Sequence, residues 1–128
     1  MSLVVDDGMA TNLRLIDSHC HLHDVEFFKG NREELYQRSI AAGIGMICVG
    51  TDERSSYQAV EFAASHDFAW AAVGVHPHDS KDGWGDIERL LKNRTENSPI
   101  VAIGEIGLDY YYNHSPREVQ IQALEAQL

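Results

Sequence analysis

The sequence predicts an α/β fold in which parallel strands alternate with helices, as in a (β/α) barrel of the TIM type. Short apolar segments recur along the chain. Counted at Leu15, Met46, Ala71 and Ile100, they stand 31, 25 and 29 residues apart. Segments with helical periodicity separate them, which is typical of a parallel sheet covered by helices. Polar residues suited to catalysis follow each apolar segment, and active sites of barrels form at the carboxyl ends of the strands.

Four strands are expected, at residues 13–20, 45–50, 68–75 and 100–106. They are nearly continuous in apolar residues, as strands buried between two layers usually are. Connections between parallel strands are right-handed, and consecutive strands are usually neighbours. We therefore expect the four strands to pair in sequence order, with the helices on the outer face of the sheet.

Four helices are expected, at residues 32–42, 56–66, 85–93 and 116–128. Asn31 can cap the first helix, with Glu34 at the third helical position and Gly43 after its end. The last helix is expected to begin at Pro116, with Ser115 as its N-cap.

The length and composition indicate one globular domain. The chain has 128 residues, of which 44% are hydrophobic, and contains no linker or low-complexity segment. Residues 13–128 are expected to form the barrel part. Residues 1–12 are polar, small and without periodicity, and they are expected to be a flexible N-terminal extension.

The charge balance limits the possible partners. Ten basic and twenty acidic residues give a net charge of −10, which argues against a broad basic surface for nucleic acid. A phosphodiester substrate remains compatible with this charge, because bound divalent cations make a site locally positive. No apolar segment is long enough to cross a bilayer, so no membrane association is expected.

The two cysteines bear on the compartment. Cys20 and Cys48 both lie in apolar strand segments. Buried, reduced thiols are the favoured interpretation, with a disulfide as the alternative. Reduced thiols are typical of a cytoplasmic protein.

A metal site is predicted where the first strand ends. The segment 17–21 reads Asp-Ser-His-Cys-His, and alternation along a strand places Asp17, His19 and His21 on one face. Two imidazoles at this spacing can ligate one divalent metal, and Asp17 could orient them from outside the ligand shell. The alternative is a pair of polar side chains satisfied by hydrogen bonds alone.

Glu105 supplies a carboxylate at the end of the fourth strand. Alternation from Val101 and Ile103 turns Glu105 inward, so it is expected to converge with the two histidines as a third ligand and catalytic group. Imidazole and carboxylate ligands suit one or two divalent ions, either zinc or manganese, with magnesium a weaker match.

Other polar residues follow the strands. His76 and His78 come after the third strand and are candidates for binding substrate phosphate, with hydrogen bonding inside the loop as the alternative. Asp109 is a second catalytic candidate that could hold a metal-bound histidine or a water, or could cap its loop. Thr51 and Asp52 mark the end of the second strand.

Two further features concern the loops. Tyr110, Tyr111 and Tyr112 form an aromatic run after the fourth strand, for which a packed loop is favoured over base stacking on single-stranded DNA. His23 follows the first strand, and a role within the loop is expected for it.

Three sequence blocks together resemble one known family. Residues 16–22 (IDSHCHL), 74–78 (GVHPH) and 104–110 (GEIGLDY) are similar, in this order, to motifs of TatD-like metal-dependent deoxyribonucleases, which belong to the amidohydrolase-like hydrolases. The resemblance implies hydrolysis of phosphodiester bonds in DNA by metal-activated water. It also implies that His19, His21 and Glu105 are metal ligands and that later strands supply further ligands.

The resemblance covers the N-terminal half of the family's fold. A complete (β/α)₈ barrel takes about 250 residues, and this chain accounts for the first four β/α units. Two alternatives stay open: the same centre could hydrolyse an amide, ester or lactone, or the chain could be a truncated fragment without independent activity. Open barrel edges also predict self-association, because unpaired edges and bare apolar faces favour pairing with another chain.

Overall fold

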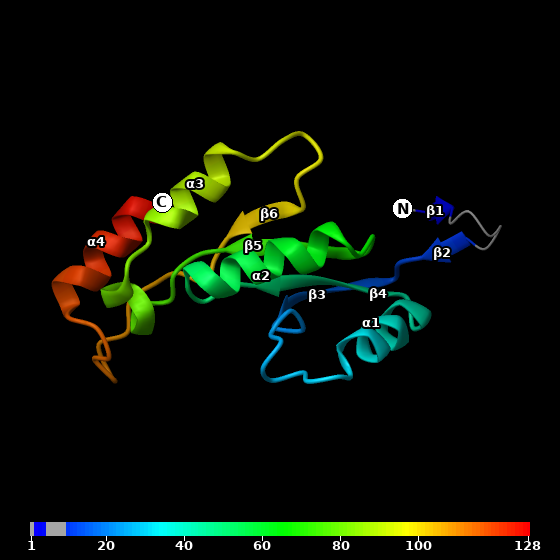
Figure 1. Ribbon diagram of the computed structural model, residues 1–128, viewed down its shortest axis with the longest axis horizontal. Helices are drawn as coiled ribbons and strands as arrows, with labels where there is room; N and C mark the ends of the chain where they lie inside the picture. Colours follow the sequence, from blue (N-terminus) through cyan, green and yellow to red (C-terminus); the bar gives the residue numbers. More distant parts are fainter. Residues whose placement is uncertain (1, 5–9) are drawn as a thin grey trace.

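Four parallel strands form the sheet that carries the candidate site. The computed structural model describes residues 2–4 and 10–128. The main sheet consists of β3 (Leu15–Cys20), β4 (Ile44–Val49), β5 (Ala69–Val73) and β6 (Ile100–Ile103). They pair in parallel in the order β3-β4-β5-β6, so the predicted order is confirmed. The carboxyl ends of the strands point to the left in Figure 1.

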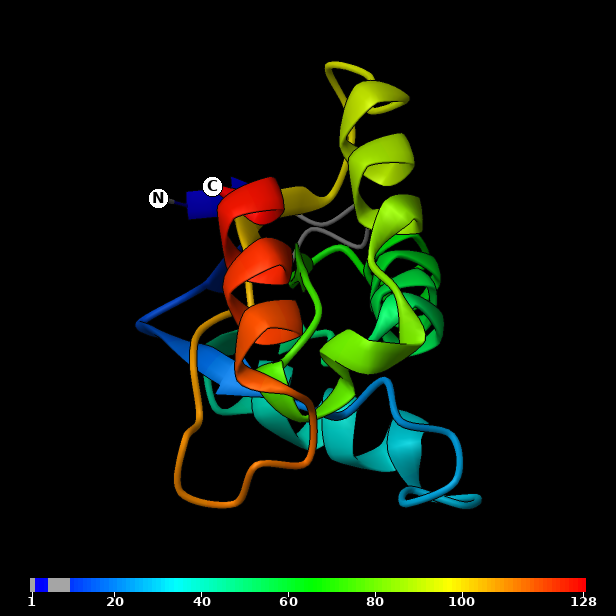
Figure 2. The same cartoon turned by 90° about the vertical axis from the view of Figure 1, so that its left-hand side faces the viewer.

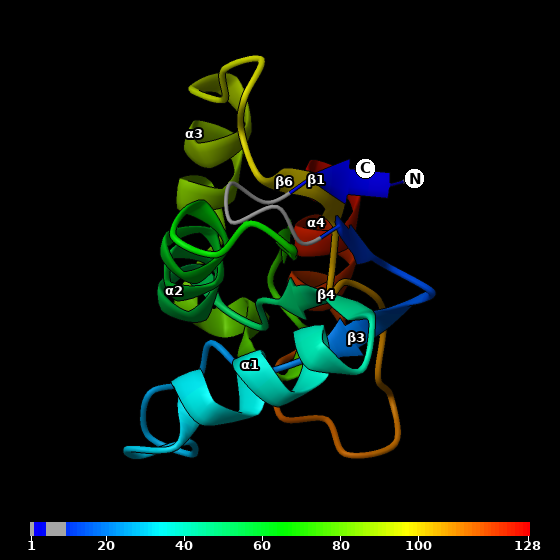
Figure 3. The ribbon, with the colours of Figure 1, turned by 90° about the vertical axis from the view of Figure 1, so that its right-hand side faces the viewer.

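The helices connect successive strands. α1 (Arg32–Ala41), α2 (Glu53–Ala64) and α3 (Gly85–Lys92) follow one another around the outer side of the curved sheet (Figure 3). α4 (Arg117–Gln127) lies beyond the carboxyl ends of the strands, beside the 3-10 helix η1 (Pro77–Asp82) (Figure 1). α1, α2 and α3 thus form the outer layer of a partial barrel, whereas the expectation that the last helix also lies on this face is wrong, because α4 packs against η1 instead.

Two apolar clusters pack the helices onto the sheet. The larger includes Tyr36 of α1, Phe62 of α2 and Met46 of β4, and the smaller includes Val73 of β5 and Ile87 of α3. All five side chains are buried. Burial of an apolar side chain of this size contributes about 1.5–3 kcal/mol relative to exposure, so these contacts fix the helices against the outer face.

The opposite face of the sheet is open. Val101 and Ile103, which lie two residues apart and so share one face of β6, are 53% and 42% exposed. Exposed apolar side chains on a sheet face favour contact with another surface. The sequence predicts this uncovered surface for four strands of a barrel.

Three helix caps differ from the sequence-based expectation. The Asp52 carboxylate accepts a hydrogen bond from the Ser55 amide (2.6 Å), so Asp52 caps α2, which begins three residues earlier than predicted. The Asn31 side chain makes no capping bond to α1. The Ser115 hydroxyl donates to the His78 carbonyl (2.8 Å) instead of capping α4. Only for Ser115 does a tertiary hydrogen bond take the place of the expected cap.

The start of the chain contains two short strands that the sequence analysis did not predict. β1 (Ser2–Val4) and β2 (Ala10–Asn12) pair antiparallel, apart from the main sheet. Residues 1 and 5–9 lie outside the described residues. The flexibility of residues 1–12, and their separation from a barrel part at 13–128, stay predictions.

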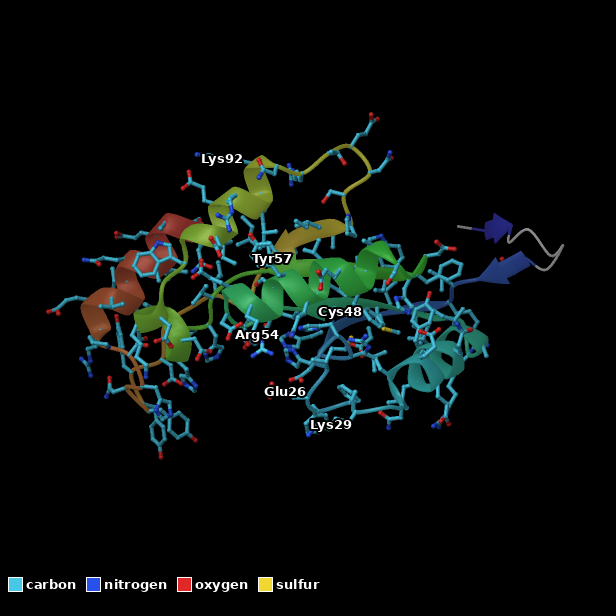
Figure 4. All side chains as sticks on the ribbon, in the orientation of Figure 1. Glu26, Lys29, Cys48, Arg54, Tyr57 and Lys92 are labelled. Carbon is cyan, nitrogen blue, oxygen red and sulfur yellow. The ribbon has the colours of Figure 1, made fainter. Side chains whose placement is uncertain are left out.

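Cys20 and Cys48 face each other across β3 and β4. Both are free thiols, with their Sγ atoms 3.9 Å apart, and Cys48 is fully buried beside α2 (Figure 4). This agrees with the reduced thiols favoured by the sequence. Among the described residues, no helix has the length and apolar character that crossing a bilayer requires.

Two glycines let the strand ends approach closely. A Cβ on Gly50 would lie 2.6 Å from the Cα of Ser56, and a Cβ on Gly74 would lie 2.7 Å from the carbonyl carbon of Gly104. The buried Ser56 hydroxyl donates to the Gly74 carbonyl and accepts from its amide, both at 3.0 Å. The start of α2 and the ends of β4, β5 and β6 are therefore held together without intervening side chains.

We predict that Gly50→Ala destabilises the fold by about 1–3 kcal/mol, the usual cost of overpacking. The added Cβ would meet the backbone of Ser56. Urea unfolding followed by circular dichroism measures the change. Gly85→Ala is the matched control, because a Cβ there meets nothing within 4 Å. Equal unfolding midpoints for the two variants would contradict the close approach.

Candidate metal centre

Three predicted ligands come together at the carboxyl edge of the sheet. His19 is the penultimate residue of β3, His21 directly follows that strand, and Glu105 follows β6. One potential ligand atom from each lies within 4.8 Å of the others. His19 Nε2 is 3.5 Å from a Glu105 carboxylate oxygen, and the two imidazole centroids are 5.1 Å apart. The two edge strands of the sheet, β3 and β6, thus supply the residues of one cluster of potential metal ligands.

The His21 ring is oriented by the backbone of the neighbouring strand. Its Nδ1 lies 2.8 Å from the carbonyl oxygen of Val49, which can only accept, so Nδ1 carries the proton and donates. That hydrogen bond leaves Nε2 unprotonated in the neutral ring, which is the form that ligates a metal. A backbone carbonyl has no sequence signature, so this partner could not be read from the residue pattern.

A bulge in β3 interrupts the alternation of side chains between Asp17 and His21. Asp17 pairs with Met46 and Cys20 pairs with Cys48, so three residue steps of β3 face two of β4. Simple alternation from Asp17 to His21 is therefore wrong, because a bulge turns the residues after it. The Asp17 carboxylate accepts from the backbone amide of His19 at 3.0 Å. Asp17 thus supports His19 through its backbone, and its predicted role in orienting the imidazoles stays a prediction.

Backbone contacts fix Glu105 between two histidines. Its amide donates to the Gly50 carbonyl (2.8 Å), across the end of β5. One carboxylate oxygen faces His19, and the other lies 3.6 Å from His76 Nε2. The His76 Nδ1 accepts from the His78 amide (3.1 Å), so the proton of the neutral ring is on Nε2 and points toward Glu105. His76 therefore lies at the edge of the cluster, where its N–H can reach a bound anion.

His78 and Asp109 form a separate pair. His78 Nε2 lies 2.5 Å from an Asp109 carboxylate oxygen. The other oxygen accepts from the amides of Tyr111 and Tyr112 (3.0 and 3.2 Å). The hydrogen bond from His78 and those from the loop amides hold the pKa of Asp109 below its usual value. Asp109 therefore caps its loop and ties it to His78.

These contacts affect two predicted roles. Within residues 2–4 and 10–128, the hydrogen bonds of Asp109 go to His78, Gln120 and its own loop rather than to the three clustered ligands. The catalytic role of Asp109 and the phosphate-binding role of His78 stay predictions.

Two buried glutamines of α4 position these loops and were not anticipated. Gln127 accepts from the Val75 amide (2.7 Å), directly before His76. Gln120 accepts from the Asp109 amide (2.8 Å) and donates to the Asp109 and Ser115 carbonyls (3.0 and 2.8 Å). They stand seven residues apart, on one face of the helix. Polar residues at helical spacing in an otherwise apolar stripe were the signal available in the sequence.

His23 is deeply buried. It is 1% exposed, and its Nδ1 has no hydrogen-bond partner among the described residues. Burial, with the neighbouring His21, lowers the pKa of His23 to about 4, so the ring is neutral at pH 7. His23 lies in the loop after β3, as expected, and its side chain is buried in the protein core.

Comparison with known proteins decides the family. The family model described as "TatD related DNase" matches residues 16–128. The chain belongs to the TatD-related DNase family. It is 39% identical over 103 residues to the "3'-5' ssDNA/RNA exonuclease TatD" of Pantoea ananatis, covering 79% of this chain and 40% of that protein. It is 33% identical over 115 residues to the "uncharacterized metal-dependent hydrolase YabD" of Bacillus subtilis, covering 89% and 45%.

Solved structures agree on the fold. The crystal structure of YjjV, a TatD homologue from Escherichia coli K12, aligns with a TM-score of 0.76 and 30% identity over 90% of this chain and 45% of that chain. An uncharacterized amidohydrolase from Saccharomyces cerevisiae, at 21% identity and a TM-score of 0.69, shares the fold. The TatD-family chain spans 40–45% of the length of the relatives named here. Its fold is thus that of the first half of a TIM-type barrel.

We predict that Asp109→Ala increases hydrogen exchange at the Tyr111 and Tyr112 amides, because both lose their acceptor. NMR-detected exchange measures this, with the exposed Asp82→Ala as control. The lowered pKa of Asp109 sets the pH dependence: the carboxylate stabilises the loop above the unfolded-state pKa of about 3.9, and this stabilisation is lost as pH falls through the lowered folded-state value. Unchanged exchange in Asp109→Ala would contradict the capping role.

Proposed function

We propose that His19, His21 and Glu105 hold one divalent metal ion in a hydrolase site that cleaves phosphodiester bonds of DNA. The observation that carries this proposal is the convergence of two imidazoles and one carboxylate within 4.8 Å at the carboxyl edge of a parallel sheet. Three protein ligands with open positions are the usual composition of a catalytic site. Family membership supports the same reaction class.

The donor set favours particular ions. Two imidazole nitrogens and one carboxylate oxygen suit zinc or manganese, and magnesium prefers oxygen ligands. The Val49 carbonyl that holds the His21 ring is the kind of outer partner that metal-bound histidines normally have. A divalent ion at such a site lowers the pKa of water and neutralises charge that develops on phosphate oxygens.

The chain's own residues bind and orient the substrate. The Nε2 proton of His76, beside Glu105, can donate to a nonbridging oxygen of the scissile phosphate. Glu105 is partly buried and is positioned through its backbone amide. Its second carboxylate oxygen, which faces His76, can accept a proton from the attacking water. Gln127 fixes the backbone before His76 and so limits the positions that its imidazole can take.

The family and one named relative support a nucleic-acid substrate. The Pantoea ananatis relative is named as an exonuclease of single-stranded DNA and RNA, and DNA is the substrate proposed for this chain. Hydrolysis of an ester or lactone is the second candidate, since the Bacillus subtilis relative is named only as a metal-dependent hydrolase. The free thiols Cys20 and Cys48 support a cytoplasmic location.

We predict that His19→Ala lowers the affinity for zinc or manganese by more than the roughly 10–100-fold that loss of an outer partner costs. Isothermal titration calorimetry measures it. His66→Ala is the matched control, because His66 contacts Glu33 and Phe62 elsewhere in the molecule. Metal-dependent release of nitrophenol from bis(p-nitrophenyl) phosphate, compared with p-nitrophenyl acetate, separates the two candidate reactions. Unchanged metal stoichiometry in His19→Ala would refute the ligand assignment.

We further propose that the chain self-associates through its open sheet. β3 and β6 are the two edges of the main sheet, and Val101 and Ile103 leave its inner face exposed. Pairing of such edges and faces removes apolar surface from water. Sedimentation velocity at micromolar concentration is expected to show a dimer or larger species, and Val101→Lys, which adds charge to that face, is expected to weaken it. A monomer across that concentration range would contradict the proposal.

A further inference from the structure

The loop between β6 and α4 presents exposed aromatic rings. Tyr111 is 86% exposed and Tyr112 is 61% exposed, so the packed-loop interpretation of this tyrosine run is wrong for these two residues. The loop extends away from the body of the molecule, and α4 returns beside it (Figure 2). Unlike the open face of the sheet, it lies past the carboxyl ends of the strands, on the side of the candidate metal centre.

The exposed rings stand on a backbone with many internal contacts. The Asp109 carboxylate accepts from both tyrosine amides, and the Gln120 side chain bonds the backbone on either side of the loop. The Ser115 hydroxyl donates to the His78 carbonyl. A fixed backbone lowers the entropy that a ligand must remove on binding, so this loop is preorganised to present its side chains.

The rings also have defined mutual geometry. Tyr112 is nearly parallel to His114, with centroids 5.5 Å apart and an interplanar angle of 6°. Tyr111 is perpendicular to Tyr112 at 4.8 Å. Tyr112 meets the His78 ring edge-on at 5.7 Å. Contacts between aromatic rings favour defined orientations. Tyr111 and Tyr112 keep most of their surface exposed, where a planar ligand can stack.

We infer that Tyr111 and Tyr112 form a stacking site for the unpaired bases of a single-stranded nucleic acid. The inference rests on the proposed function, because it assumes that the substrate is a nucleic acid. A chain of contacts joins the tyrosine loop to the candidate metal centre. The Tyr112 ring contacts His78, the His78 amide donates a hydrogen bond to His76, and His76 faces Glu105. A strand whose phosphate lies at Glu105 would pass its neighbouring bases over this loop.

Charge favours stacking over ionic attraction as the source of affinity. The chain carries a net charge of −10. Of the described residues, two cations contact this loop: Lys81 donates to the His114 carbonyl, and Arg117 lies 4.6 Å from the Tyr110 centroid. One or two phosphate contacts predict a shallow salt slope, about −0.7 to −1.4 for single strands. Duplex bases already stack on each other, so the site selects single strands.

Fluorescence anisotropy in EDTA tests this without hydrolysis. The probes are a labelled oligothymidylate of 12 nucleotides and a matched abasic oligomer with the same phosphates. Tyr111→Ala/Tyr112→Ala is expected to lose roughly tenfold or more in affinity for oligothymidylate, because stacking on one base is worth this much. The double variant Tyr111→Phe/Tyr112→Phe is expected to keep it. Tyr57→Ala is the control, since Tyr57 lies on α2 beside Arg89 (Figure 4).

Each outcome bears on the inference. Support requires that the wild type prefers oligothymidylate to the abasic oligomer and that the alanine double variant loses this preference. Equal binding of the two oligomers, or no effect of the alanine variant, would overturn the stacking site. Absence of binding to either oligomer would also overturn it. Calorimetric metal binding by His19 and His21, measured separately, still reports on the proposed function in those cases.

Discussion

The close approach of the strand ends is the constraint on which the candidate site depends. Gly50 and Gly74 have no side chain where α2 and β6 pack against them, and the Glu105 amide can therefore donate to the Gly50 carbonyl across the end of β5. This backbone contact turns the Glu105 carboxylate toward His19, although β3 and β6 are the outermost strands of the sheet. The ligand cluster is thus a product of backbone packing as much as of residue type.

A second set of contacts connects this cluster to the periphery. His76 faces the ligand carboxylate, its ring accepts from the backbone of His78, and His78 is bound to Asp109. Asp109 in turn holds the tyrosine loop, and Gln120 of α4 fixes Asp109. The start of α4 and the loops after β5 and β6 are therefore coupled through polar side chains whose hydrogen-bonding groups are largely satisfied.

Much of the fold follows from periodicity, whereas local detail depends on tertiary contacts. Apolar spacing and right-handed connections were sufficient to predict four parallel strands in sequence order, and inward alternation on the first and fourth strands was the basis for expecting His19 to lie near Glu105. Alternation could not reveal the bulge in β3 between Asp17 and Cys20, because a bulge is a pairing irregularity between strands. Residue type likewise could not distinguish Asp52 as a helix cap from a functional residue, nor identify the Val49 carbonyl as a partner of His21.

The most direct measurement is anomalous diffraction from crystals of this chain grown with zinc, collected above and below the zinc edge. The account predicts one peak about 2.0–2.2 Å from a nitrogen of His19, a nitrogen of His21 and an oxygen of Glu105. It also predicts that His21 Nδ1 keeps its contact with the Val49 carbonyl. An ordered ion bound elsewhere, or these three side chains without a peak between them at saturating zinc, would contradict the account.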